Sequence, residues 1–181
     1  SLFADFQQTH EDLRLPGALT EPQLAVSRKQ TFFPNDFNNS INKSARVGGA
    51  LRLTPNWDFA AEVTYRDDDV DGVLTGLNLK QKRRQVTVNP RLRGTLPVGQ
   101  HTLSLVIGSD LENSDYILTS PFGSQIGDQE MFCVYTLATL PINRYVSVSA
   151  GYRKAWHDRE LVDGFRFLPG NELKDNQTAN N

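Results

Sequence analysis

Apolar and polar residues alternate along most of this chain of 181 residues. Between residues 86 and 96, Val86, Val88 and Leu92 share one parity, whereas Arg91 and Arg93 share the other. Because successive side chains of a strand point to opposite faces, this pattern predicts a β-strand with one apolar and one charged face. The same period of two predicts about seven strands, at residues 1–10, 44–54, 57–67, 82–96, 101–113, 129–140 and 145–156.

The alternation also predicts which side chains share a face of the sheet. We expect the apolar set on the convex side: Leu51, Leu53, Trp57, Phe59, Val63, Val86, Val88, Leu92, Leu103, Leu105 and Ile107. We expect the charged set on the concave side: Arg46, Arg52, Glu62, Arg66, Arg91 and Arg93. Segment 129–140 has bulky apolar groups on both parities, so its faces stay unassigned. Pro90 lacks an N–H group and predicts a bulge or gap in the ladder.

The connections between the predicted strands alternate in length. Three are short and contain proline, TPNW, PVGQ and PINR, and are typical of hairpin turns. The others, at 11–43, DVDGVLTGLNLKQK, SDYILTSPFGSQIGD and after Trp156, are predicted to be long loops. We therefore predict an all-β, antiparallel up-and-down meander whose short turns share one end, the layout of an outer-membrane barrel. Strands of this length span about 25–33 Å when tilted, enough for the apolar band of that membrane.

Composition and motifs exclude several classes of function. The formal net charge of -2 argues against nucleic-acid binding, and Cys133, the single cysteine, excludes an intrachain disulfide. No stretch approaches the roughly 20 apolar residues of a membrane helix. No catalytic motif occurs, and the three histidines are scattered, so we expect neither an enzyme nor a metal or cofactor site. The run RDDDVDG faintly resembles a calcium-binding loop, but the downstream Glu that such a loop requires is missing. We therefore favour the interpretation that these aspartates are solvated loop charges, partly neutralised by Arg66, over a calcium site.

Two other architectures fit the same alternation. In a soluble β-sandwich binding module, the apolar parity would pack on a second sheet of the same chain. In a small self-contained outer-membrane barrel, an adhesin or an enzyme, the strands would close on themselves, although such barrels have even strand numbers of eight or more.

Several phrases resemble the barrel domain of TonB-dependent outer-membrane receptors of the siderophore type: LRLPGALT, FFPNDFNNS, VGGALRLTPNWDFAAEVTYRDDD, VNPRLRG, SDYILTSPFGSQIGDQE and VSVSAGYRK. The resemblance covers nearly the whole chain. It implies a larger barrel of about 22 strands around a plug, in the outer membrane of a Gram-negative bacterium. It also implies uptake of a ferric siderophore or similar chelate, with outer-membrane lipid and TonB, reached through the plug, as partners. Residues 1–181 show no plug, signal peptide or TonB box, so we expect an internal piece of that barrel, with ELKDNQTANN starting the next strand.

Five residues are expected near the loop ends of their strands with side chains that point inward, and we take them as candidate ligand contacts: Arg66, Arg83, Tyr116, Arg153 and His157. Cationic and aromatic groups suit an anionic, aryl-bearing ferric chelate through charge-assisted hydrogen bonds and stacking. The basic run KQKRR, residues 80–84, fits a positive mouth or a rim that meets lipid phosphates. In the alternative interpretation, these side chains line a wet rim and pair with Asp67–Asp69 or Asp115.

Overall fold

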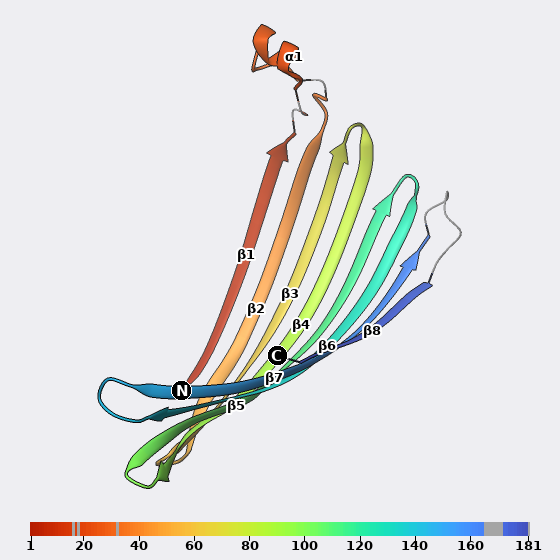
Figure 1. Ribbon diagram of the computed structural model, residues 1–181. Coiled ribbons are helices and arrows are strands. Elements are labelled where there is room, and N and C mark those ends of the chain that lie inside the picture. The colour runs from red at the N-terminus through yellow and green to blue at the C-terminus, as the bar shows by residue number, and fades with distance from the viewer. Residues whose placement is uncertain (16, 18, 32, 165–171, 181) are drawn as a thin grey trace.

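The strands form one antiparallel sheet in which each strand pairs with its neighbours in sequence. The computed structural model describes residues 1–15, 17, 19–31, 33–164 and 172–180. The strands are β1 (Leu2–Arg14), β2 (Phe37–Thr54), β3 (Trp57–Leu74), β4 (Leu77–Val98), β5 (His101–Ser120), β6 (Gly123–Pro141), β7 (Ser147–Asp163) and β8 (Glu172–Asn180). The helix α1 (Glu21–Val26) lies beyond the strand ends, in the connection between β1 and β2 (Figure 1). The sheet is curved, and its order from β1 to β8 leaves it open at both edges.

This architecture confirms the predicted meander. The seven expected strands correspond to β1–β7, and the segment expected to start another strand forms β8. The three proline-containing turns lie at one end of the sheet, and α1 with the β3–β4 and β5–β6 hairpin tips lies at the other (Figure 1). We call these the short-turn end and the loop end.

Two of the predicted long loops are wrong. Strands β3 and β4 continue to a tight turn at Thr75 and Gly76, and β5 and β6 continue to a turn at residues 121–122. The apolar alternation stops before the strands do, because both faces of these extensions carry polar groups. Cross-strand pairing continues there, since Asp69 lies opposite Lys82 and Asp71 opposite Lys80. Opposite charges facing each other favour such pairing without any apolar face.

The register confirms the predicted separation of faces. Leu51 lies opposite Phe59, and Leu92 lies opposite both Phe59 and Ile107. Paired residues share a face, so these side chains form a continuous apolar face across β2–β5. Arg46, Arg52, Glu62, Arg66, Arg91 and Arg93 have the other parity and lie on what we call the polar face. Leu53 is the exception among the assigned residues, because it lies at the register shift between Arg52 and Thr54 and has no partner on β3.

The same register assigns the two faces of residues 129–140, which the sequence leaves unassigned. Phe132 lies opposite Leu111, which puts it on the apolar face, and Cys133 lies opposite Asp110 on the polar face. The polar face is the concave one, because every strand residue that is buried has this parity and side chains crowd on the inner side of a curved sheet. These residues are Ser40, Gly48, Gly72, Ser114 and Cys133.

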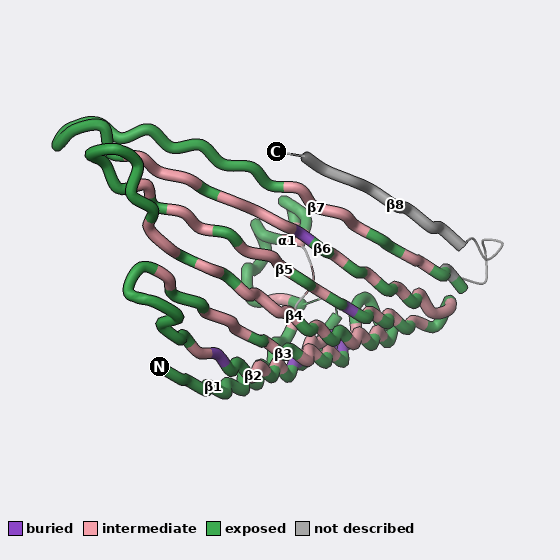
Figure 2. The backbone as a smooth tube through the Cα atoms, turned by 90° about the horizontal axis from the view of Figure 1, so that it is seen from below, coloured by how far each residue is buried: buried purple, intermediate pink, exposed green. Residues whose placement is uncertain are grey.

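The described residues form a single layer with almost no core. Val63 and Ile107 are each 45% exposed, and Cys133 is the only buried hydrophobic side chain in the described part of the chain. Figure 2 shows the backbone as one sheet, with exposed residues on each of the strands β1–β7. Within the described ranges, no second layer of this chain covers the apolar face, so the sandwich interpretation lacks its second sheet. None of the described residues belongs to a helix long and apolar enough to cross a membrane.

The height of the apolar face can be estimated on β3. On β3 it runs from Trp57 to Tyr65, which corresponds to about 21 Å for a strand tilted about 40° and fits the apolar height of an outer-membrane barrel, about 25 Å. Its loop-end edge carries Phe132 and Trp156, which stack with ring centroids 5.4 Å apart. At its short-turn edge, the ring of Trp57 covers Gly94 on the neighbouring strand. Aromatic residues at both edges are typical of membrane interfaces.

Pro90 leaves the predicted gap in the ladder. Pairing between β4 and β5 passes from Val88–Leu111 directly to Arg91–Gly108, with no change of register. The strands therefore stay aligned without a bulge, and polar side chains occupy the gap.

Candidate functional site

Three of the five candidate residues meet on the polar face, at the loop-end edge of the apolar band. Arg83 on β4 lies opposite Tyr116 on β5 and opposite Asp68 on β3. Arg66 lies two residues from Asp68 on the same strand face, and its Nε is 2.9 Å from Asp68 Oδ2. We call Arg66, Asp68, Arg83 and Tyr116 the upper cluster.

The two arginines of the upper cluster differ in how they are engaged. Asp68 is 14% exposed and holds Arg66 in an ion pair, so the charge of Arg66 already has a partner inside the protein. Arg83 donates from Nε to Ser114 Oγ over 3.4 Å and forms no ion pair within the described part of the chain. A cation held only by a hydroxyl keeps its attraction for an incoming anion. Arg83 is therefore the stronger candidate for contacting an anionic ligand.

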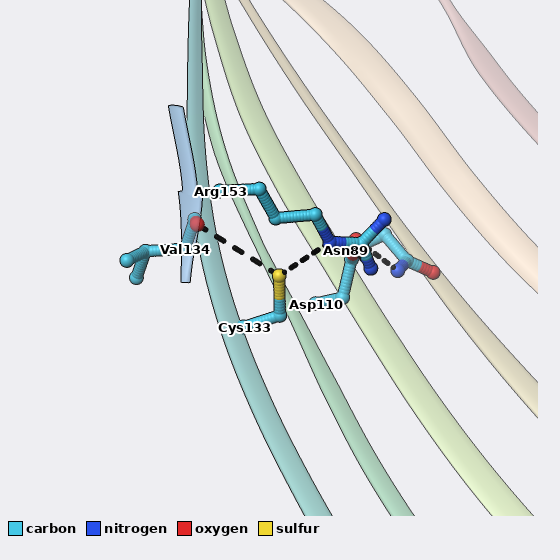
Figure 3. Close-up of polar contacts among 5 residues, drawn as sticks. All are labelled: Asn89, Asp110, Cys133, Val134 and Arg153. Carbon is cyan, nitrogen blue, oxygen red and sulfur yellow. Dashed lines mark hydrogen bonds and ion pairs between the residues drawn. The ribbon is translucent and has the colours of Figure 1, made fainter. Parts of the chain in front are cut away.

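Arg153 lies elsewhere, and its expected place at the loop end is wrong. It pairs with Tyr135 in the middle of β7, at the depth of the apolar band. Its Nη2 is 3.3 Å from Asp110 Oδ2, and its Nε donates to Cys133 Sγ over 2.9 Å. Asp110 Oδ1 accepts a hydrogen bond of 2.9 Å from Asn89 Nδ2 (Figure 3). These four side chains link β4, β5, β6 and β7, and we call them the mid-barrel network.

The mid-barrel network fills the gap that Pro90 opens. Asn89 and Asp110 stand where the backbone ladder between β4 and β5 is interrupted, and their side chains make the link that the backbone omits. Asp110 is 21% exposed, so its charge is partly shielded from water and benefits from both the amide and the guanidinium. The geometry therefore assigns Arg153 a role in tying the wall together.

His157 lies opposite Met131 on the polar face, one residue beyond Trp156. It is half-buried and stands near the loop-end edge of the apolar band. Among the residues that the structure describes, no three His, Cys, Asp or Glu side chains gather where they could hold a metal ion. The run RDDDVDG belongs to β3 and not to a loop, and its Asp67 and Asp71 face Arg84 and Lys80.

Carboxyl groups gather on the outer surface beyond the apolar band, on β5 and β6. A hydrogen bond with Asp115 raises the pKa of Asp128 above its ordinary value of 3.8, with smaller contributions from desolvation and from the charges of Asp115, Glu160 and Glu130. Asp115 and Asp128 lie directly opposite each other in the register, which brings their two carboxyl groups together.

Comparison with solved structures identifies the fold. The ferric citrate transporter FecA, in its unliganded form, superposes with a TM-score of 0.84 at 14% identity, over 98% of this chain and 30% of FecA. The fold is that of a siderophore-receptor barrel wall. The siderophore receptor PiuA from Acinetobacter baumannii (TM-score 0.71, 13% identity) matches over 81% of this chain and 30% of its own. The closed form of the ferric-catecholate import receptor Fiu from E. coli K12 (TM-score 0.72, 12% identity) matches over 99% of this chain and 37% of Fiu.

This chain thus spans about a third of the length of these receptors. No family model matches the sequence, and no curated protein is significantly similar to it. The likeness therefore concerns the arrangement of strands, and it confirms the fold that the resemblance to TonB-dependent receptors implies.

The sequence did not reveal the partners within the mid-barrel network. One feature could have pointed to Asn89 and Asp110: both alternate with the apolar residues of their strands, and they lie next to the position of Pro90 in the register. No such feature pointed to Cys133, since its segment has apolar groups on both parities.

Proposed function

We propose that this chain is part of the barrel wall of a TonB-dependent receptor that takes up a ferric siderophore or a similar chelate across the outer membrane of a Gram-negative bacterium. In this proposal residues 1–181 belong to a larger barrel, outer-membrane lipid contacts the apolar face, and a plug on the polar side connects to TonB. The protein acts as a transport receptor and not as an enzyme.

One observation carries the proposal: a single-layer sheet exposes a continuous apolar band on one face and charges on the other. Ile107 is 45% exposed at the centre of that band, while Arg91 and Arg93 occupy the opposite face at the same depth. In water an apolar sheet face needs a covering layer, whereas in a membrane barrel lipid covers it and the interior tolerates ions. The superposition on FecA, PiuA and Fiu supports the same assignment.

For the ligand, we propose contacts at the upper cluster. Arg83 and Tyr116 offer a cation and an aromatic ring side by side, and Arg66 adds a second cation. Anionic ferric chelates fit this set through charge-assisted hydrogen bonds and stacking. His157 near the same edge, and Arg153 deeper on β7, are further candidates along the inner wall.

The test uses the full-length receptor in detergent, with ferric citrate and a ferric catecholate as probes and affinity measured by calorimetry. Arg66→Glu together with Arg83→Glu should weaken binding of the recognised chelate about tenfold or more at an ionic strength of about 0.01 M. The loss should shrink at about 0.5 M, because salt screens exposed charges. Arg144→Glu serves as the charge-reversal control, since Arg144 lies over Tyr145 in the short turn between β6 and β7, far from the upper cluster.

Equal affinities for wild type and the Arg66/Arg83 variant at low ionic strength would remove the upper cluster from the ligand site. Failure of the wild-type receptor to bind any ferric chelate would instead contradict the proposed function itself.

A further inference from the structure

Asp36 is a buried carboxylate at the loop end of the sheet, just before β2. It is 3% exposed, the lowest exposure among the buried polar residues of the described chain. Its two oxygens accept hydrogen bonds from the backbone amides of Thr75 and Gly76, the latter over 3.1 Å. Asp36 therefore reaches from the β1–β2 connection to the tip of the β3–β4 hairpin.

The hairpin tip has a geometry that leaves these two amides available. Thr75 and Gly76 have φ angles of 52° and 77°, and positive φ at both central residues defines the two-residue turn that matches the twist of a hairpin. Their N–H groups lie outside the ladder and would otherwise bond only to water. A carboxylate that accepts both forms charge-assisted bonds, which are about twice as strong as neutral ones.

The backbone of Asp36 collects two more segments at the same place. Its carbonyl accepts from Leu15 N over 3.1 Å, directly beyond β1, and its own N–H donates to Phe33 O over 3.1 Å. The ring of Phe33 lies so close to Gly17 that a Cβ there would be 2.9 Å from Phe33 Cδ2. The described residues from Leu15 to Asp36, which we call the α1 connection, are therefore gathered at their base by Asp36 and Phe33.

The α1 connection also has internal order. Leu24 N donates to Thr20 O over 2.9 Å, and Thr20 N donates to Gln23 Oε1 over 2.7 Å. Because the segment has its own hydrogen bonds, one anchoring point at its base is enough to fix its position as a whole.

We propose that Asp36 is a positioning residue that fastens the α1 connection to the β3–β4 hairpin tip, so that the two move as one body at the loop end. Its place at the extracellular mouth rests on the proposed function, whereas the fastening does not. A ligand approaching that mouth then meets a preformed wall of two segments instead of two independent loops, which lowers the ordering cost of binding.

The test is hydrogen exchange followed by mass spectrometry on the full-length protein, without ligand. Asp36→Asn keeps the shape of the side chain but removes its charge and one of its two acceptor oxygens. Exchange at the Thr75 and Gly76 amides should become about tenfold faster or more, since a hydrogen bond to a charged group is worth at least that factor. Asp69→Asn is the matched control, because Asp69 is exposed on the same hairpin and pairs across the ladder with Lys82.

A second variant tests the coupling from the other side. Insertion of one glycine between Thr75 and Gly76 displaces the tip amides without touching the α1 connection, and hairpin tips tolerate such insertions. Exchange in the peptide that covers Glu21–Val26 should accelerate by a similar factor while the strands stay protected.

Equal exchange in the Asp36 and Asp69 variants would overturn the proposal, and so would an unchanged α1 connection in the insertion variant. Because no ligand is present, either result is independent of whether the receptor binds a chelate.

Discussion

Replacing Ile107 by arginine should destabilise the protein strongly, because Ile107 lies at the centre of the apolar face. On β5 the apolar run extends from Leu103 to Leu111, four residues to either side. At about 3.4 Å per residue and a tilt of about 40°, Ile107 lies roughly 10 Å from each edge of the band. An arginine near the bilayer midplane of a barrel costs about 2–4 kcal/mol, so Ile107→Arg should lower the free energy of unfolding by about that amount.

The assay is a urea titration of the full-length protein in lipid vesicles, followed by tryptophan fluorescence. Ser104→Arg is the matched control, because Ser104 lies on the polar face of the same strand, opposite Thr95 and Thr139. An exposed substitution there should change the free energy of unfolding by no more than about 0.5 kcal/mol. If both variants lost the same stability, or neither lost any, the assignment of the two faces would be refuted.

Two further predictions concern Asp128 and Cys133. The pKa of Asp128 is raised in the folded state by Asp115, so its ionised form is disfavoured there and wild-type stability falls as the pH rises through that pKa. Asp128→Asn should therefore raise the urea midpoint at pH 7, with a gain that disappears as the pH falls below about 4; a gain independent of pH would contradict this reasoning. Cys133 is fully buried beneath Arg153, so maleimide should label it slowly in the folded protein. Arg153→Ala should accelerate labelling and Arg159→Ala should not, and equal rates in the two variants would argue against the mid-barrel network.

The alternation of residues was sufficient to predict the sheet where its two faces have different environments. Between Val86 and Leu96 one face is apolar and the other charged, and a slip of one residue would exchange them, so the pattern determines the register. From Arg84 toward the loop end both faces are polar and the pattern fades. The predicted strands therefore end earlier than β3 and β4 do. The turn at Thr75 and Gly76 lies inside the predicted loop, although a Thr-Gly pair between Leu74 and Leu77 is compatible with a hairpin tip.

The candidate site was predictable only in part, because parity determines the face of a side chain but not its partner. Arg83 and Tyr116 share a face and a pair position, and their loop-end location followed from the strand order. The link from Arg153 to Asp110 spans 43 positions and depends on the register of β5, β6 and β7 together. No local pattern contains that information. The prediction places Arg153 at the loop end because the expected strand stops at residue 156, whereas β7 continues to Asp163.

The central claim is that the apolar face of this sheet contacts lipid and the polar face does not. The most direct test places a spin label singly at residues 60–65 of β3, in a Cys133→Ser background of the full-length protein in lipid vesicles. The ratio of collision rates with oxygen, which concentrates in lipid, and with a water-soluble nickel chelate is then measured at each position. Alternation with a period of two is predicted, with high ratios at Ala61, Val63 and Tyr65 and low ratios at the even positions. A flat profile, or high nickel accessibility at Val63, would contradict the account.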